Sequence, residues 1–155
     1  MKRKTLLLVP ALALGVAAAA FAQQAPKPEQ LIKWRQSAYQ VIAWNSGRIK
    51  ANVEGTYNKD EVVKAANTIA AIANSGLGAL FAPGTETGKG WHDTTVKPAL
   101  FTDGAKAGAA AAAFNKEANE LAKVAAGGDQ AAVKTQFAAL SKTCKGCHDD
   151  FRNSN

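Results

Sequence analysis

The chain has little of what several common folds and functions require. Aromatic residues make up 7% of its 155 residues and seldom alternate with polar ones, so neither an all-β nor an α/β fold is expected. After residue 22, no apolar stretch approaches the ~20 residues of a membrane span. Beyond residues 2–4 the basic side chains form no run, which argues against a nucleic-acid-binding protein. Cysteine and histidine occur twice each, and the single methionine is Met1.

The first 22 residues have the pattern of an export signal. Basic residues 2–4 precede an uncharged apolar stretch over residues 6–20, and Ala20-Phe21-Ala22 has the small residues that a signal peptidase requires. We expect cleavage before Gln23 and export to the periplasm. A retained membrane anchor is the alternative, although the stretch is short for a span. Cleavage leaves 16 of the 19 basic residues against 12 acidic ones, a net charge of +4, and no methionine.

Apolar residues at three- and four-residue spacing predict four helices within residues 23–155, which we take as one domain. The expected helices cover residues 29–51, 58–76 and 98–126, and a fourth, capped by Asp129, carries apolar residues from Val133 to Phe151. The expected buried stripe of the first helix is Leu31, Trp34, Ala38, Val41, Asn45 and Ile49. The alanines at 109–113 predict a face where a neighbouring helix packs closely. Short connections between these segments predict an all-α, antiparallel four-helix bundle.

The most specific motif is Cys-Lys-Gly-Cys-His at residues 144–148. On a helix, Cys144 lies one turn before Cys147 and His148, so all three face the same side. The two thiols can bond to the two vinyl groups of a haem while His148 reaches the iron. Three alternatives are less favoured. A thioredoxin-like thiol pair lies at the start of a helix after a strand, and no strand is expected before this motif. A disulfide between cysteines three residues apart constrains the chain little, and a zinc site would need further ligands, of which His92 is the only other strong one. We therefore expect one covalently bound haem c in the bundle core.

The absence of methionine from the mature chain bears on the iron. Histidine–methionine ligation, the arrangement of ordinary electron-carrying cytochromes, is not possible. His92 is the only other histidine and falls in the loop between the second and third expected helices. It would have to fold over the haem to act as a ligand, so we expect a surface histidine. The iron is then expected to be five-coordinate, ligated by His148 and open or nearly open on its distal face.

At this point the chain resembles the cytochromes c′, a family of class II c-type cytochromes. The resemblance rests on the C-terminal motif with residues 149–152, on Lys-Trp-Arg-Gln-Ser-Ala at 33–38, and on Phe-Ala-Pro-Gly-Thr-Glu at 81–86. These patches occur in the family's order, and the resemblance covers residues 23–155. It implies a homodimer formed through the first two helices.

The resemblance also implies roles for individual residues. The implied haem contacts are Arg35 at a propionate, Gln36 beside it, Tyr39 over the iron, Thr85 and Glu86 near the haem edge, and Arg152 in the proximal pocket. Each has a structural alternative: Arg35 as a solvated arginine, Tyr39 as a core aromatic, and Arg152 as a complement to the negative end of the last helix. The tryptophans are expected to be packing residues.

Two functions fit these expectations. The first is a gas-binding haem protein, because nitric oxide and carbon monoxide bind ferrous haem without a distal hydrogen bond; the resemblance implies protection against nitric oxide. The second is an electron carrier between periplasmic redox partners, for which an open coordination position raises the reorganisation cost. No enzymatic activity is expected, since a peroxidase would need a distal histidine and arginine pair. Gas binding is the preferred interpretation.

Overall fold

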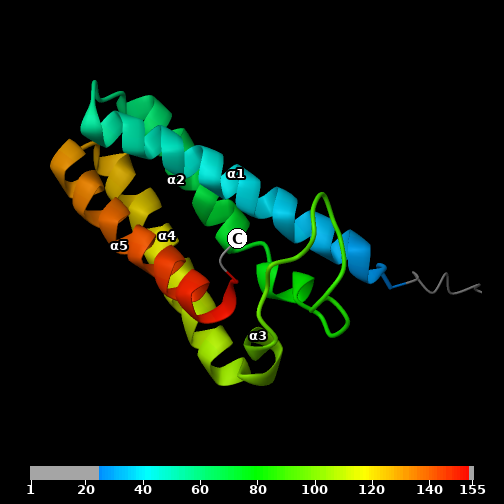
Figure 1. The fold of residues 1–155 in the computed structure, drawn as a ribbon. Helices are drawn as coiled ribbons and strands as arrows, with labels where there is room; N and C mark the ends of the chain where they lie inside the picture. The colour runs from blue at the N-terminus through cyan, green and yellow to red at the C-terminus, as the bar shows by residue number, and fades with distance from the viewer. Residues whose placement is uncertain (1–24, 154–155) are drawn as a thin grey trace, which may run out of the picture.

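The computed structural model describes residues 25–153, so the expected export signal lies outside the described residues. The helices are α1 (Pro28–Glu54), α2 (Lys59–Ala73), the 3-10 helix η1 (Leu77–Leu80), α3 (Ala99–Thr102), α4 (Gly104–Gly127) and α5 (Gln130–Phe151). The long helices α1, α2, α4 and α5 pack as an antiparallel bundle (Figure 1), which confirms the predicted fold class. Within residues 25–153, no helix is long and apolar enough to cross a bilayer.

The helix starts follow local side-chain chemistry. The Asn58 side chain accepts a hydrogen bond from the Glu61 amide at the start of α2, and Asp129 does the same for Ala132 at the start of α5. The single helix expected over residues 98–126 is wrong. The backbone leaves helical geometry at Asp103, whose carboxylate accepts from the Lys106 amide and begins α4 as a separate helix.

The bundle core draws apolar side chains from all four long helices. Its largest fully buried members are Ile49, Ile69, Leu121, Leu140, Val62 and Val133. The stripe predicted for α1 is wrong in its first half, because Trp34 and Val41 are 44% and 40% exposed while their neighbours Arg35 and Ile42 are buried. Because apolar residues are adjacent in this helix, its sequence is compatible with two different buried faces. The observed buried face includes Arg35, which hydropathy assigns to the surface.

One further packing expectation is wrong. The alanine run at 109–113 lies mostly exposed, because α4 is buried through the later positions Ala118, Leu121 and Ala125. The tryptophans lie outside the core, with Trp44 and Trp91 63% and 57% exposed, although Trp91 packs against Lys33 and Ser37 of α1.

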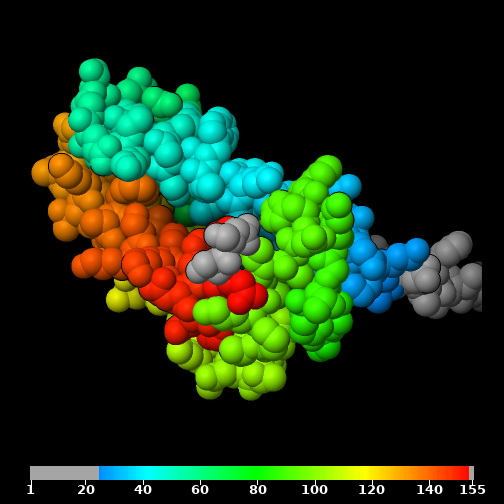
Figure 2. Space-filling view, in the orientation of Figure 1, coloured from blue at the N-terminus to red at the C-terminus, as the bar shows by residue number. Residues whose placement is uncertain are grey.

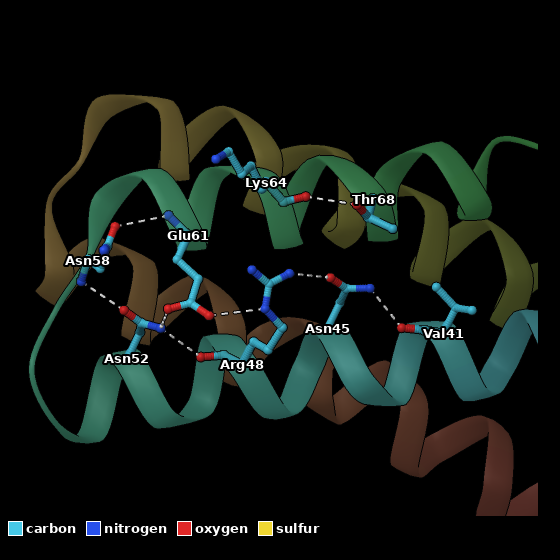
Figure 3. Close-up of polar contacts among 8 residues, drawn as sticks. All are labelled: Val41, Asn45, Arg48, Asn52, Asn58, Glu61, Lys64 and Thr68. Carbon is cyan, nitrogen blue, oxygen red and sulfur yellow. Dashed lines mark hydrogen bonds and ion pairs between the residues drawn. The ribbon is translucent and has the colours of Figure 1, made fainter.

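A polar network joins α1 to α2 near the start of α2 (Figure 3). Asn45 is fully buried; it donates to the Val41 carbonyl and accepts from the Arg48 guanidinium. Asn52 and Arg48 both donate to the Glu61 carboxylate, at 3.2 and 3.1 Å. These two hydrogen bonds hold the pKa of Glu61 below its ordinary value. The carboxylate therefore remains charged at neutral pH and links the two helices.

Candidate functional site

The site lies between α1 and α5, two helices that contact each other far less than α1 contacts α2 or α5 contacts α4. Tyr39 of α1 packs edge-on against Phe81, with ring centroids 6.3 Å apart. Burial, and then the nearby thiols of Cys147 and Cys144, raises the pKa of Tyr39 to about 12. Tyr39 is 39% exposed, and with this pKa its hydroxyl keeps its proton at neutral pH.

All five residues of the Cys-Lys-Gly-Cys-His motif lie on α5, where Cys144 is one helical turn before Cys147 and His148. Cys144 and Cys147 are free, half-buried thiols, and burial raises the pKa of each. Burial also lowers the pKa of His148, and the neighbouring Arg152 charge adds to this effect. A neutral imidazole is the form that ligates a metal. Among the residues that the structure describes, no group of three His, Cys, Asp or Glu side chains could hold a metal ion, so the zinc alternative gains no support.

Arg35 is the most unusual side chain of the site, a guanidinium that is only 4% exposed. It donates to the Thr85 hydroxyl and carbonyl, both at 2.8 Å, to the Thr94 hydroxyl at 2.6 Å and to the Leu80 carbonyl at 3.3 Å. All of these acceptors are neutral, and no described carboxylate forms an ion pair with Arg35. Burial lowers its pKa, while Tyr39 and Glu86 oppose this effect.

A buried cation with only neutral partners is costly, and an anionic partner would offset that cost. The site therefore fits a cofactor that brings a carboxylate beside Arg35 and reactive carbons beside the two thiols. A haem, with its propionates and vinyl groups, has both.

The structure brings the implied loop residues Thr85 and Glu86 to Arg35: Thr85 is fully buried against its guanidinium, and Glu86 acts on its pKa. Arg152 ends α5, where its backbone bridges to Val96 and its charge acts on His148. The segment after η1 thus contacts α1 and the end of α5; Figure 2 shows it in green beside the blue start of α1 and the red end of α5.

Gln36 lies beside these residues, but its amide already has protein partners. It contacts the backbone of Trp91 and His92, so its implied haem contact stays a prediction. His92 is exposed, as expected of a surface loop histidine. Sequence reasoning missed Thr94, which no local pattern distinguishes from other loop threonines.

Comparison with known proteins decides the family. A family model described as Cytochrome C' matches residues 30–152, nearly all of the described chain. The chain belongs to the cytochrome c′ family. Membership implies a c-type haem, in agreement with the two thiols on α5.

Similar cytochromes c′ cover most of the chain. The cytochrome c′ of Rhodocyclus tenuis is 72% identical over 127 residues, covering 81% of this chain and 96% of that protein. The crystal structure of cytochrome c′ from Thermochromatium tepidum is 47% identical, with a TM-score of 0.80 over 83% of this chain and 98% of that one.

Two other solved cytochromes c′ bear on function. One, described as having ligand-controlled dimer dissociation, is 48% identical with a TM-score of 0.81, and covers 83% of this chain and 98% of its own. The other is a nitric oxide complex of a variant from Alcaligenes xylosoxidans, 27% identical with a TM-score of 0.74 and the same coverage.

Proposed function

We propose that this cytochrome c′ is a periplasmic gas-binding protein that takes nitric oxide or carbon monoxide on an open face of its haem and protects against nitric oxide. One observation carries the proposal. The half-buried thiols and His148 share one side of α5, and the thiols act on the pKa of Tyr39 on α1, which stays protonated at neutral pH. When bound, the haem supplies a five-coordinate iron that can accept a small neutral ligand.

The chain's own residues would each have a defined task. Cys144 and Cys147 attach the haem through thioether bonds, and His148, whose pKa is lowered, is the iron ligand. Arg35 pairs with a propionate. Tyr39 covers the distal face without ligating the iron, because a pKa of about 12 disfavours the tyrosinate form. No methionine occurs in residues 25–153, so a strong competing thioether ligand is absent from the described chain.

The exposed face of α1 supports a homodimer through the first two helices. Trp34, Val41 and Trp44 are 44%, 40% and 63% exposed on this helix. An exposed apolar face of this kind is typical of an interaction surface. The solved relative with ligand-controlled dimer dissociation is consistent with this assembly.

Electron transfer is the second candidate, favoured by the basic surface around the end of α5. Lys142 and Arg152 are exposed there and would attract an acidic redox partner, whereas Lys145 pairs with Asp149. Neither function requires catalytic turnover, and we propose none.

Variants of Tyr39 test gas binding. Tyr39→Ala should raise the rate of carbon monoxide association about tenfold or more, equivalent to ~1.4 kcal/mol of barrier, because the ring covers the distal face. Tyr39→Phe should change the rate much less, since it keeps the ring. The measurement is stopped-flow absorbance of the reduced protein. Tyr57→Phe, at the chain's other tyrosine, is the matched control. A wild-type protein that binds no gas, or a Tyr39→Ala rate equal to wild type, would contradict the proposal.

A further inference from the structure

The loop between η1 and α3 contains a small hairpin, residues 88–94, referred to below as the 88–94 hairpin. The Thr94 amide donates to the Gly88 carbonyl at 2.9 Å, Lys89 and Asp93 form an antiparallel bridge, and the Gly90 amide donates to the His92 carbonyl at the tip. The backbone of Gly88 has φ of +109°, which a glycine adopts without strain. The hairpin is therefore a defined local structure within an irregular loop.

Gln36 of α1 binds the tip of this hairpin through both ends of its side-chain amide. Its oxygen accepts from the Trp91 amide at 2.7 Å, and its nitrogen donates to the His92 carbonyl at 2.9 Å. These two hydrogen bonds, called here the Gln36 contact, have the donor and acceptor pattern of a backbone pairing.

Neighbouring residues of α1 support the same contact. The Trp91 indole donates to the Ser37 hydroxyl at 2.8 Å, and the Lys33 ammonium lies 4.0 Å from the centre of its ring. Gly90 approaches so closely that an added Cβ would come within 2.8 Å of the Lys33 backbone. The contacts of Trp91 and the absence of a side chain at Gly90 thus allow the hairpin tip to pack directly against α1.

The base of the hairpin meets Arg35, the residue that precedes Gln36. The Thr94 hydroxyl accepts from the Arg35 guanidinium at 2.6 Å. Beyond the hairpin, the Lys97 amide donates to the Phe151 carbonyl, and the Asn153 amide to the Thr95 carbonyl. The hairpin is consequently held at its tip by Gln36, at its base by Arg35, and just beyond its base by the end of α5.

We propose that Gln36 is a positioning residue that acts on the haem through Arg35. The Gln36 contact fixes the hairpin tip, the hairpin fixes Thr94, and Thr94 with Thr85 holds the guanidinium in one orientation. This inference rests on the proposed placement of a haem propionate at Arg35. A fixed, buried positive charge beside the haem favours its reduced state and raises the reduction potential. Loss of the Gln36 contact lets the guanidinium reorient toward water, and the potential falls.

A double-mutant cycle read out as the reduction potential of the haem-loaded protein tests this role. Gln36→Leu should lower the potential, and Arg35→Gln should lower it further. In the Arg35→Gln background, Gln36→Leu should cause no additional shift, because its effect passes through Arg35. Gln40→Leu is the matched control, since Gln40 is an exposed glutamine one turn along the same helix and should leave the potential unchanged.

Hydrogen exchange reports on the contact itself. The Trp91 amide should exchange about tenfold faster or more in Gln36→Leu than in wild type, a change of ~1.4 kcal/mol in local opening. Unchanged exchange, an unchanged potential, or an equal potential shift with and without Arg35 would each overturn the positioning role. The last of these would instead indicate a direct haem contact by Gln36. A wild-type chain that carries no haem c would refute the proposed function, a result distinct from a haem-loaded protein whose potential is independent of Gln36.

Discussion

Replacing both cysteines, in the variant Cys144→Ser/Cys147→Ser, is expected to abolish covalent haem attachment completely. These are the only two cysteines of the chain, and a serine hydroxyl does not form the thioether bond. The measurement is haem staining of the denatured protein after expression with a competent attachment system. Wild type should retain its haem under denaturing conditions, and the double variant should retain none.

The control for this prediction is Ser141→Ala, an exposed position one turn before Cys144 on the same helix. It should retain its haem as wild type does. We also expect the double variant to lose thermal stability and helicity, because α1 and α5 contact each other sparsely and the cofactor would fill the space between them. Covalent haem in the double variant would refute the attachment site. Native helicity and stability without haem would show that the bundle core does not depend on it.

Arg35→Gln is expected to cost the haem-loaded protein about 3 kcal/mol or more in free energy of unfolding, as does breaking a buried ion pair. The variant removes the charge that faces the propionate and disrupts a guanidinium held by Thr85, Thr94 and Leu80. Chemical denaturation followed by circular dichroism measures the loss.

The matched control is Lys123→Gln, on the surface of α4. Lys123 pairs with Glu120 at an exposed position, where an ion pair contributes about 1 kcal/mol or less. If Arg35→Gln were no more destabilising than Lys123→Gln, a buried charge pair at Arg35 would be excluded.

The sequence predicted the features that depend on local chemistry. The caps at Asn58 and Asp129 were readable because a side chain that accepts from an amide three residues later leaves a local signature. The stripe predicted for α2 is confirmed, because Val62, Ala66 and Ile69 are all buried.

The expectations failed where more than one local pattern was available. In α1 the pair Val41 and Ile42 allowed two phases, and the buried positions include the polar Arg35 and Asn45, which hydropathy assigns to the surface. The break at Asp103 was also missed, although an aspartate before Gly104 is a common helix start.

The candidate site was predictable in its chemistry and less so in its architecture. The haem attachment motif at residues 144–148 is recognised from the spacing of its cysteines and histidine alone, so its prediction required no knowledge of the tertiary structure. The docking of Trp91 on Gln36 joins residues 55 positions apart, and the bond from Arg35 to Thr94 spans 59. Such contacts follow from the packed fold, and no local periodicity encodes them.

The central claim is an open, histidine-ligated haem, and an absorption spectrum of the purified protein tests it most directly. The spectra required are of the oxidised protein, the reduced protein, and the reduced protein under carbon monoxide or nitric oxide. We expect a broad, high-spin Soret band in the reduced protein that sharpens and shifts when gas is added. A sharp, low-spin spectrum that gas does not change would contradict it, would point to His92 as a second iron ligand, and would favour electron transfer.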